Sequence, residues 1–459
     1  MPAAQHSRGC ITCRVIRAVL LALLTLIIMQ DQRSGARAHE RPYFMPLVER
    51  DRLHGLILKE GWAKEAYARL KSAASTGDGF AAAFLYALDG DPKNASIAQQ
   101  WLLGKYGKKA YWTVQAAERL SGEFFKGGQV GIPEVYYDTD LSGYLAFDWA
   151  HKGLEATARK EIEEGIVLWS RYKMRAMDRW TQTANLVFKP TSTVALAGLA
   201  TDNRELIEWG FRRTKPWGTR LGGYDVVLDT MLKDGGPWHE APIYPIAHEG
   251  LLMISRLSRW RSLYDQKDWF SARYANGGSG RGLMDYYIDS AYPIERTGYG
   301  PGQIRVANYG DGSTNAMGDL ILVNPAAAAG NIVMHEPLIA AYNASRDPRY
   351  GAFVAMILGY TPNLIDHPPL PTAIQLPPAP SKVWPTYGLA MLRSDESPGY
   401  WTSGKAIAVF QIMSKGYGHD HRDKFSISLH GAGRLFYPNY NALQYENPSV
   451  GWTRNSTTR

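Results

Sequence analysis

A single segment near the C-terminus combines closely spaced ionisable residues with the alternation of a β-strand. Residues 418–429 read GHDHRDKFSISL, and apolar and polar residues alternate from Phe425 onward, as in a half-buried strand. Extended backwards, the alternation places His419, His421 and Asp423 on the same face as Phe425 and the apolar residues after it. Unpaired ionisable groups are costly to bury. The segment therefore predicts a mutually paired cluster, a metal site or the floor of an active site.

A second segment, residues 234–245, reads DGGPWHEAPIYP and leads into a helix expected near Ala247. Its Gly and Pro content is typical of a turn, and functional residues are concentrated in loops that a rigid scaffold positions. Tyr244 is the residue of this turn with a chemically useful hydroxyl. Taken alone, it also fits the description of an ordinary core tyrosine.

These two segments, in this order, resemble the heparinase II/III-like and alginate-lyase polysaccharide lyases. The resemblance rests on Asp-Gly…Glu…Pro-Ile-Tyr within 234–245, on Gly-His-x-His-x-Asp-Lys at 418–424, and on a weaker match at Ala184 and Asn185. It covers most of the chain in layout. It implies an incomplete α/α toroid followed by antiparallel β-sheets. It also implies β-elimination on a polysaccharide that contains uronic acid, of the alginate or glycosaminoglycan type.

The resemblance implies a role for each matching residue. Asn185 would neutralise the substrate carboxylate, Tyr244 would remove the C5 proton, and His419 would be the partner base or acid. An amide donor can stabilise the enolate-like charge that develops. A tyrosine with an ordinary pKa of about 10 needs a lowered pKa to act as a base at neutral pH, and a histidinium at His419 or His239 would lower it. His239 and Glu240 are candidates for substrate binding, with a structural role as the alternative for Glu240.

The resemblance also raises the question of zinc. In several relatives the second His of the Gly-His-x-His motif, an acidic residue about one strand later and a further His bind the metal. His421 matches the first ligand, but Asn439 stands where the acidic ligand is expected. Because a structural zinc site takes about four ligands, we expect no required cofactor and at most a weak structural zinc. Asp423 is then the natural partner of His421.

Three other functions remain open from the sequence. A uronate C5-epimerase would remove the C5 proton in the same way as a lyase. A non-catalytic glycan-binding protein would need only a cleft that binds the glycan. A glycoside hydrolase on an α/α toroid needs two carboxylates flanking the bond, for which Glu240 with Asp234 or Asp311 could serve.

The N-terminus has the outline of a secretory signal peptide. Three arginines precede an apolar run at 18–29, and Ala-Arg-Ala follows at 36–38. The run is too short for an ordinary membrane span, although an uncleaved anchor is the alternative. We therefore predict a signal peptide at 1–38 and a periplasmic or secreted protein. Both cysteines, Cys10 and Cys13, would be removed with it, so the processed chain would be stable without disulfides.

The charge balance excludes one class of partner. Removal of residues 1–38, which carry five Arg and one Asp, lowers the formal net charge of the 459-residue chain from +8 to +4. No basic run, zinc finger or Gly-rich phosphate loop accompanies this mild excess, so we expect no nucleic-acid binding. An anionic polysaccharide is compatible with it, and oligomeric state stays open.

The order of the periodic patterns predicts a multidomain α+β protein. Helical spacing occurs across 39–360, at 53–74, 81–87, 96–103, 109–125, 141–177, 192–200, 203–213 and 250–264. This fits an incomplete α/α toroid, and a helical solenoid would look similar. Prolines concentrate in 361–385, which predicts an extended linker. Strand-like runs at 387–392, 406–413, 424–430 and 434–437 then predict a partial antiparallel β-sheet domain over 386–459, apparently truncated at its C-terminus.

Overall fold

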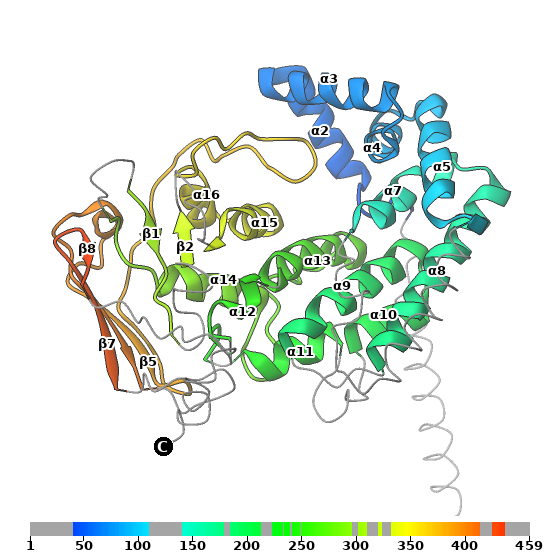
Figure 1. The fold of residues 1–459 in the computed structure, drawn as a ribbon. Helices are drawn as coiled ribbons and strands as arrows, with labels where there is room; N and C mark the ends of the chain where they lie inside the picture. The colour runs from blue at the N-terminus through cyan, green and yellow to red at the C-terminus, as the bar shows by residue number, and fades with distance from the viewer. Residues whose placement is uncertain are drawn as a thin grey trace, which may run out of the picture. The chain divides into compact units, whose positions relative to one another are not determined.

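We describe a computed structural model of the chain (Figure 1). The described residues are 40–109, 140–178, 184–212, 223–232, 234–238, 241–247, 249–295, 302–309, 320–323, 332–413 and 425–436. The predicted signal peptide lies outside them. From Arg41 onward the described residues belong to one compact unit.

Helices dominate the first part of this unit. They are α2 (Leu47–Lys59), α3 (Gly61–Ser75), α4 (Gly79–Asp89), α5 (Pro92–Tyr106), α7 (Ser142–Ala150), the 3₁₀ turn η2 (His151–Gly153), α8 (Ala156–Asp178), α9 (Ala184–Thr201), α10 (Arg204–Arg212), α11 (Tyr224–Met231), α12 (Tyr244–Ala247), α13 (Gly250–Asp265), α14 (Gly280–Asp289), α15 (His335–Ser345) and α16 (Pro348–Val354). Most consecutive helices pack on one another, and α13 packs against both α9 and α15. The helix-rich region is confirmed, whereas the toroid stays a prediction.

Local signals set several helix boundaries. Asp78 caps α4 by accepting bonds from the backbone of Phe80 and Ala81, both at 3.0 Å, and Asp91 caps α5 with Pro92 in its first position. These are favoured residue types for helix starts. The predicted helix at 53–74 is divided, because Glu60 takes an extended conformation between α2 and α3.

A small sheet interrupts the helical part, and the sequence patterns did not predict it. It contains β1 (Ile304–Arg305), β2 (Leu320–Val323) and β3 (Ile332–Val333). β1 and β2 are antiparallel, and β2 and β3 are parallel. Two of these strands have only two residues, which is too short for an alternating pattern to be recognised.

The second part of the unit is a five-stranded antiparallel sheet. Its strands are β4 (Lys382–Trp384), β5 (Leu389–Arg393), β6 (Ala408–Ile412), β7 (Ser426–Gly431) and β8 (Arg434–Leu435), in the order of the sequence. The 3₁₀ helix η4 (Pro398–Thr402) lies between β5 and β6. β5 to β8 confirm the four predicted strands. β4 lies within the last residues of the stretch expected as a linker, whereas 361–381 contains no helix or strand.

The buried face of β7 is the opposite of the predicted one. Phe425 is 79% exposed and Ile427 is 53% exposed, whereas the side chains of Ser428 and His430 are buried. The prediction that the face of Phe425 packs into the core is therefore wrong. His419, His421 and Asp423, which were placed on the same face by extension, lie outside the described residues.

Strand register gives the physical reason. Ser428 pairs with Phe410 and His430 pairs with Ala408, and both β6 residues are buried. Paired residues lie on the same face of a sheet, so β6 decides which face of β7 points inward. The outward face also carries apolar residues, among them Val383 on β4 and Leu392 on β5. The alternation of apolar and polar residues therefore predicted two different faces of β7, but it did not predict which face packs into the core.

The inward face of the sheet packs on α14 and the segment after it. Trp384 contacts Tyr286 edge to face, with ring centroids 5.1 Å apart. Lys382 Nζ lies 2.5 Å from Asp289 Oδ2, and Arg393 donates to the backbone oxygen of Asp289 at 2.5 Å. Contacts between side chains therefore join the end of α14 to the first two strands of the sheet.

Candidate active site

The structure describes the environment of one of the three predicted catalytic side chains. Tyr244 is the first residue of α12, and its side chain is buried. Asn185 is the second residue of α9, and its side chain lies outside the description. The remaining predicted site residues, which are His239, Glu240, His419, His421 and Asn439, lie outside the described residues.

The turn before Tyr244 is attached to the sheet through Asp234. The backbone N–H of Thr386 donates to Asp234 Oδ2 at 2.7 Å, and the Thr386 hydroxyl donates to Oδ1. The backbone N–H of Tyr387 adds a longer bond of 3.4 Å. Both donors belong to the turn between β4 and β5. Because both oxygens of Asp234 are engaged, this carboxylate is poorly suited to serve as one of the two acids of a glycoside hydrolase.

Helix α14 supports the same turn from another side. A Cβ atom on Gly236 would overlap the carbonyl oxygen of Gly282, and one on Gly282 would overlap that of Gly235. Only glycine allows so close a backbone approach. The Tyr287 hydroxyl also donates to the backbone oxygen of Pro242 at 2.5 Å. The glycines noted in the sequence thus place the turn, and with it Tyr244, directly on α14.

An ion pair links the segment after Tyr244 to the helix that carries Asn185. Lys189 Nζ of α9 lies 3.4 Å from Glu249 Oε1, in the residue that precedes α13. Glu249 follows α12 closely, and its N–H donates to the backbone oxygen of Ile246 at 2.8 Å. Since α9 packs on α13 and α13 packs on α12, the start of α9 and Tyr244 belong to the same part of the molecule.

The next turns of α9 are polar although they are buried. Pro190 lies inside the helix and leaves one backbone carbonyl without its helical donor. The Thr191 hydroxyl donates to the Phe188 oxygen at 3.1 Å, and the Thr193 hydroxyl donates to the Pro190 oxygen at 2.9 Å. The buried Lys173 of α8 donates to Thr193 Oγ1 at 3.2 Å. α9 therefore brings hydroxyls and ammonium groups into a buried region directly after the turn of Asn185.

The segment that carries His419 leaves and re-enters the sheet at the end where Asp234 is attached. At this end the N–H of Met413 donates to the Gly388 oxygen at 2.6 Å, and the N–H of Phe425 donates to the Ile412 oxygen at 2.7 Å. Gly388 belongs to the β4–β5 turn. Contacts between described residues thus link α9 to Glu249 and α12, and they separately link Asp234 to the β4–β5 turn and the ends of β6 and β7.

A second buried polar cluster lies between the sheet and the segment after α14. Glu295 Oε2 lies 2.6 Å from Arg305 Nε and accepts from Gln303 Nε2 at 3.1 Å, while Glu295 Oε1 accepts from the N–H of Leu435 at 3.0 Å. His430 is fully buried nearby, and burial lowers its pKa, which keeps it neutral at neutral pH. No local pattern marks these residues, because the cluster exists only once distant segments pack together.

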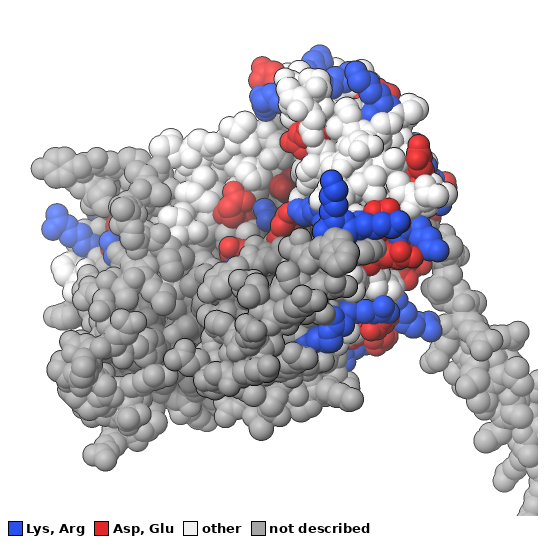
Figure 2. Space-filling model, turned by 45° about the vertical axis from the view of Figure 1, so that its right-hand side comes forward, with Lys and Arg blue, Asp and Glu red and all other residues white. Residues whose placement is uncertain are grey.

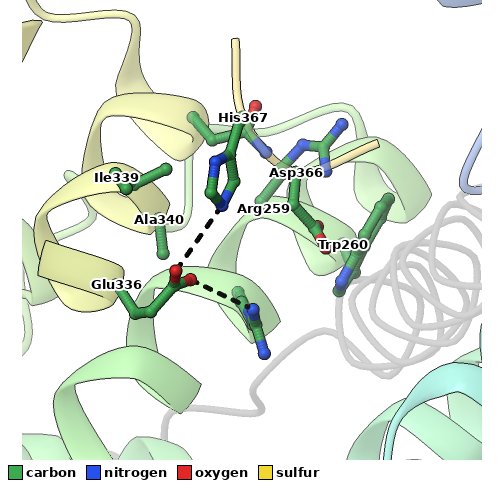
Figure 3. Close-up of a pocket in the computed structure, with 9 residues that line it drawn as sticks. Arg259, Trp260, Glu336, Ile339, Ala340, Asp366 and His367 are labelled. Carbon is green, nitrogen blue, oxygen red and sulfur yellow. Dashed lines mark ion pairs between the residues drawn. The ribbon is translucent and has the colours of Figure 1, made fainter. Parts of the chain in front are cut away.

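A small pocket lies between α13, α15 and the segment before β4 (Figure 3). Glu336 lies 3.6 Å from His367 Nε2 and 3.7 Å from Arg256, and Arg259 donates to the Ile365 oxygen at 3.2 Å. The pair raises the pKa of His367 and holds the pKa of Glu336 below its usual value. The charges of this pocket thus pair with one another and attach the segment around residue 367 to the helices. Tyr244, the predicted site residue whose side chain the structure describes, does not line it.

Charged side chains of both signs alternate on the helical face shown in Figure 2. Ion pairs on the helices include Arg171 with Glu205 at 2.6 Å and Arg52 with Glu49 at 2.6 Å. On the described part of this face, basic side chains therefore lie among acidic ones and do not form a patch of one sign.

Two predictions concern metals and membranes. Within the described ranges, no three His, Cys, Asp or Glu side chains come together as a metal site. His421 and Asn439 are not among these ranges, so structural zinc stays a prediction. Of the helices described, none combines the length and apolar character of a membrane span.

The solved structures to which the chain is similar include a heparan sulfate lyase. The chain is similar to heparan sulfate lyase HepC from Pedobacter heparinus, with a TM-score of 0.45 and 12% sequence identity over 83% of this chain and 51% of HepC. The chain thus spans about half the length of that lyase. No family model matches the chain, and no curated protein matches it.

Proposed function

We propose that the protein is a polysaccharide lyase that cleaves a uronic-acid-containing anionic polysaccharide by β-elimination. One observation carries the proposal. Lys189 of α9 pairs with Glu249, which follows Tyr244 closely, and Asp234 of the turn before Tyr244 is bonded to the β4–β5 turn at one end of the sheet. These contacts support a site to which the segments of Asn185 and Tyr244 both contribute, and the position of His419 stays a prediction.

Each residue would contribute a separate step. Asn185 would donate a hydrogen bond to the uronate carboxylate and stabilise the negative charge that develops as the C5 proton leaves. Tyr244 would take this proton, and an acid, either His419 or the tyrosine itself, would protonate the departing oxygen at C4. The carbon–oxygen bond breaks as the C4–C5 double bond forms, so no water is consumed.

A tyrosine base requires a cation close to its hydroxyl. An ordinary tyrosine is protonated at neutral pH, and a nearby positive charge favours the phenolate. His419 and His239 are the sequence candidates for this charge. The proposal includes export to the periplasm or the medium, where polymers of this kind are accessible.

The decisive experiment follows ultraviolet absorbance with alginate, heparan sulfate, hyaluronan and glucuronan as substrates. Elimination conjugates a new double bond to the carboxylate, so we expect absorbance to rise with at least one polymer. Tyr244→Phe should lower the rate by about 10²- to 10⁴-fold, the usual contribution of a general base. Tyr400→Phe is the matched control, because it removes a buried hydroxyl that donates to the Ala291 oxygen at 3.0 Å in the sheet region.

Other outcomes would assign a different reaction. New reducing ends without a rise in absorbance would indicate a hydrolase, and exchange of the C5 proton without chain cleavage would indicate an epimerase. A rise in absorbance that Tyr244→Phe leaves unchanged would remove Tyr244 from the mechanism.

A further inference from the structure

The pocket between α13 and α15 (Figure 3) contains a buried amide that bonds to no other described residue. Asn343 of α15 is 8% exposed and lines this pocket together with Arg259 of α13. Within the described part of the chain, the Asn343 side chain makes no hydrogen bond. A buried polar group without a partner is costly, and in native proteins a bound molecule often supplies the partner. The amide therefore indicates a polar ligand.

Guanidinium groups adjoin the pocket where α2, α13 and α15 meet. Glu49 of α2 pairs with Arg52 at 2.6 and 2.8 Å, and Arg259 lies 3.7 Å from the same carboxylate. Arg346 directly follows α15, and its side chain forms no ion pair or hydrogen bond with the described residues. Burial and the charges of Arg259 and Arg52 lower the pKa of Arg346 to about 10, so it stays charged at neutral pH. Three cations thus share one carboxylate.

The pocket offers acceptor oxygens beside these cations. Glu336 lies 3.6 Å from His367 and 3.7 Å from Arg256, whereas Asp366 lines the pocket and its charge acts on Arg259. The interior has room for a group of about the size of a water molecule, such as a hydroxyl. Cations, acceptor oxygens and an amide that both donates and accepts together fit a ligand with hydroxyls and an acidic group.

From this arrangement we propose that the pocket and the adjoining guanidinium groups form a subsite for one acidic sugar of a uronate polysaccharide. The sugar carboxylate would bind Arg346 and Arg259, because guanidinium groups match carboxylates with paired hydrogen bonds. A hydroxyl of the same sugar would enter the pocket and bond to Asn343 and Asp366. The inference rests on the proposed function for the class of polymer, and it adds a subsite built from residues other than those of the elimination step.

Arg346→Asn tests the charged part of the subsite. Its φ of 54° is a backbone conformation that asparagine tolerates better than most residues, so the variant should fold. We expect affinity for an alginate oligosaccharide to fall about tenfold or more, as for the loss of a bond to a charged group. KM should rise with kcat unchanged, because this contact is the same in the ground state and the transition state.

Arg171→Asn is the matched control for the lost charge. It breaks the exposed pair with Glu205 on the helical surface and should change neither affinity nor KM.

Asn343→Leu tests the pocket itself. The amide makes no bond to the described residues, so an apolar side chain of similar size should leave the melting temperature unchanged. Affinity for the oligosaccharide should nevertheless fall about threefold or more, the effect of one lost hydrogen bond. A lower melting temperature with unchanged affinity would overturn the inference, because the amide would then serve the fold alone.

Binding is measured by isothermal titration calorimetry in the Tyr244→Phe background, so that the ligand is not consumed, and KM is measured with Tyr244 present. The probes are an alginate oligosaccharide and the same oligosaccharide with its carboxyl groups reduced to alcohols. Arg346→Asn should weaken binding of the acidic probe more than that of the reduced probe, whereas Asn343→Leu should weaken both. Unchanged affinity of Arg346→Asn for the acidic probe would overturn the inference, and so would an equal loss for both probes.

The outcomes separate this inference from the proposed function. If the oligosaccharide binds but no polymer gives an ultraviolet signal, the lyase proposal fails while the variants still test the subsite. If turnover is normal and Arg346→Asn leaves KM unchanged, only the inference fails. Absence of binding by the parent protein would overturn the inference, and the ultraviolet assay then decides the lyase proposal by itself. If Asn343→Leu does not fold, Arg346→Asn decides alone.

Discussion

The two buried polar regions of this protein differ in how completely their charges are paired. Beside the sheet, Glu295 accepts hydrogen bonds from Gln303 and Leu435, its Oε2 lies 2.6 Å from Arg305 Nε, and its side chain is 10% exposed. Between α9 and α13, the buried Lys189 has a half-exposed carboxylate at 3.4 Å as its charged partner. Burial is common to both regions, but the carboxylate beside Lys189 is half exposed, whereas that of Glu295 is itself buried.

The difference indicates how a binding region can be distinguished from a structural one. A closed network such as that of Glu295 stabilises the packing of distant segments, and any ligand would have to break several bonds to enter it. An open pair loses little when its partner is exchanged. The bonds of Glu295 to segments remote in sequence therefore favour a structural role for this residue.

Removal of Glu295 should lower the free energy of unfolding more than any other change proposed for the two regions. A small loss would contradict the difference between them. Glu295→Ala leaves the partly buried guanidinium of Arg305 without its carboxylate and the N–H of Leu435 without its acceptor, so we expect the free energy of unfolding to fall by about 3 kcal/mol. Glu249→Ala, the matched variant of the other region, should lower it by no more than about 1 kcal/mol, because Lys189 keeps its further interactions when the half-exposed Glu249 carboxylate is removed. Urea denaturation measures both. Similar losses in the two variants would contradict the distinction.

A third buried carboxylate, that of Asp148, should make the free energy of unfolding depend on pH. It is fully buried and accepts from the N–H groups of Tyr43 and Phe44 at 3.1 and 2.8 Å, yet burial raises its pKa from 3.8 to about 6. Because the folded state binds this proton more tightly, its contribution is present below about pH 4 and is lost as pH rises through about 6. The free energy of unfolding should fall by roughly 3 kcal/mol across this window. Asp148→Asn should flatten that part of the profile, and an unchanged slope would contradict the assignment.

Substitution of Asp234 tests whether its bonds to the β4–β5 turn hold the candidate site in place. The expected loss of unfolding free energy is smaller than for Glu295 or Asp148. Asp234→Ala removes the acceptor of Thr386 and Tyr387, which should lower the free energy of unfolding by about 1–2 kcal/mol. It should also reduce turnover, because the turn before Tyr244 loses its anchor. Asp234→Asn is the control, since asparagine keeps one acceptor and tolerates the φ of 50° at this position. Full activity in Asp234→Ala would show that the anchor does not position Tyr244.

Local patterns predicted the types of most elements and the importance of the turn before Tyr244. The helical spacing of 250–264 corresponds to α13, and the four strand-like runs correspond to β5 to β8. The Gly and Pro residues of 234–245 indicated a turn, and the structure shows this turn attached to both α14 and the sheet. Such features are predictable because they depend on residues adjacent in the chain.

The failures have a common physical origin. Phe425 and Ile427 were expected to be buried because they are apolar, yet the register with β6 turns Ser428 and His430 inward. The short strands β1 and β3 exist through pairing with β2, since two residues carry no period of their own. Each of these outcomes depends on a partner segment that the local pattern does not contain.

The order of helices and strands and the residue types available for elimination chemistry follow from the amino-acid sequence alone. Periodicity and turn signals depend on residues adjacent in the sequence, so they can be recognised from the sequence. The tertiary structure alone decided which face of β7 is buried, that Glu295 closes a network with Arg305, and that Lys189 reaches Glu249. Burial and charge pairing depend on distances between segments remote in sequence, and those distances exist only after the chain has folded.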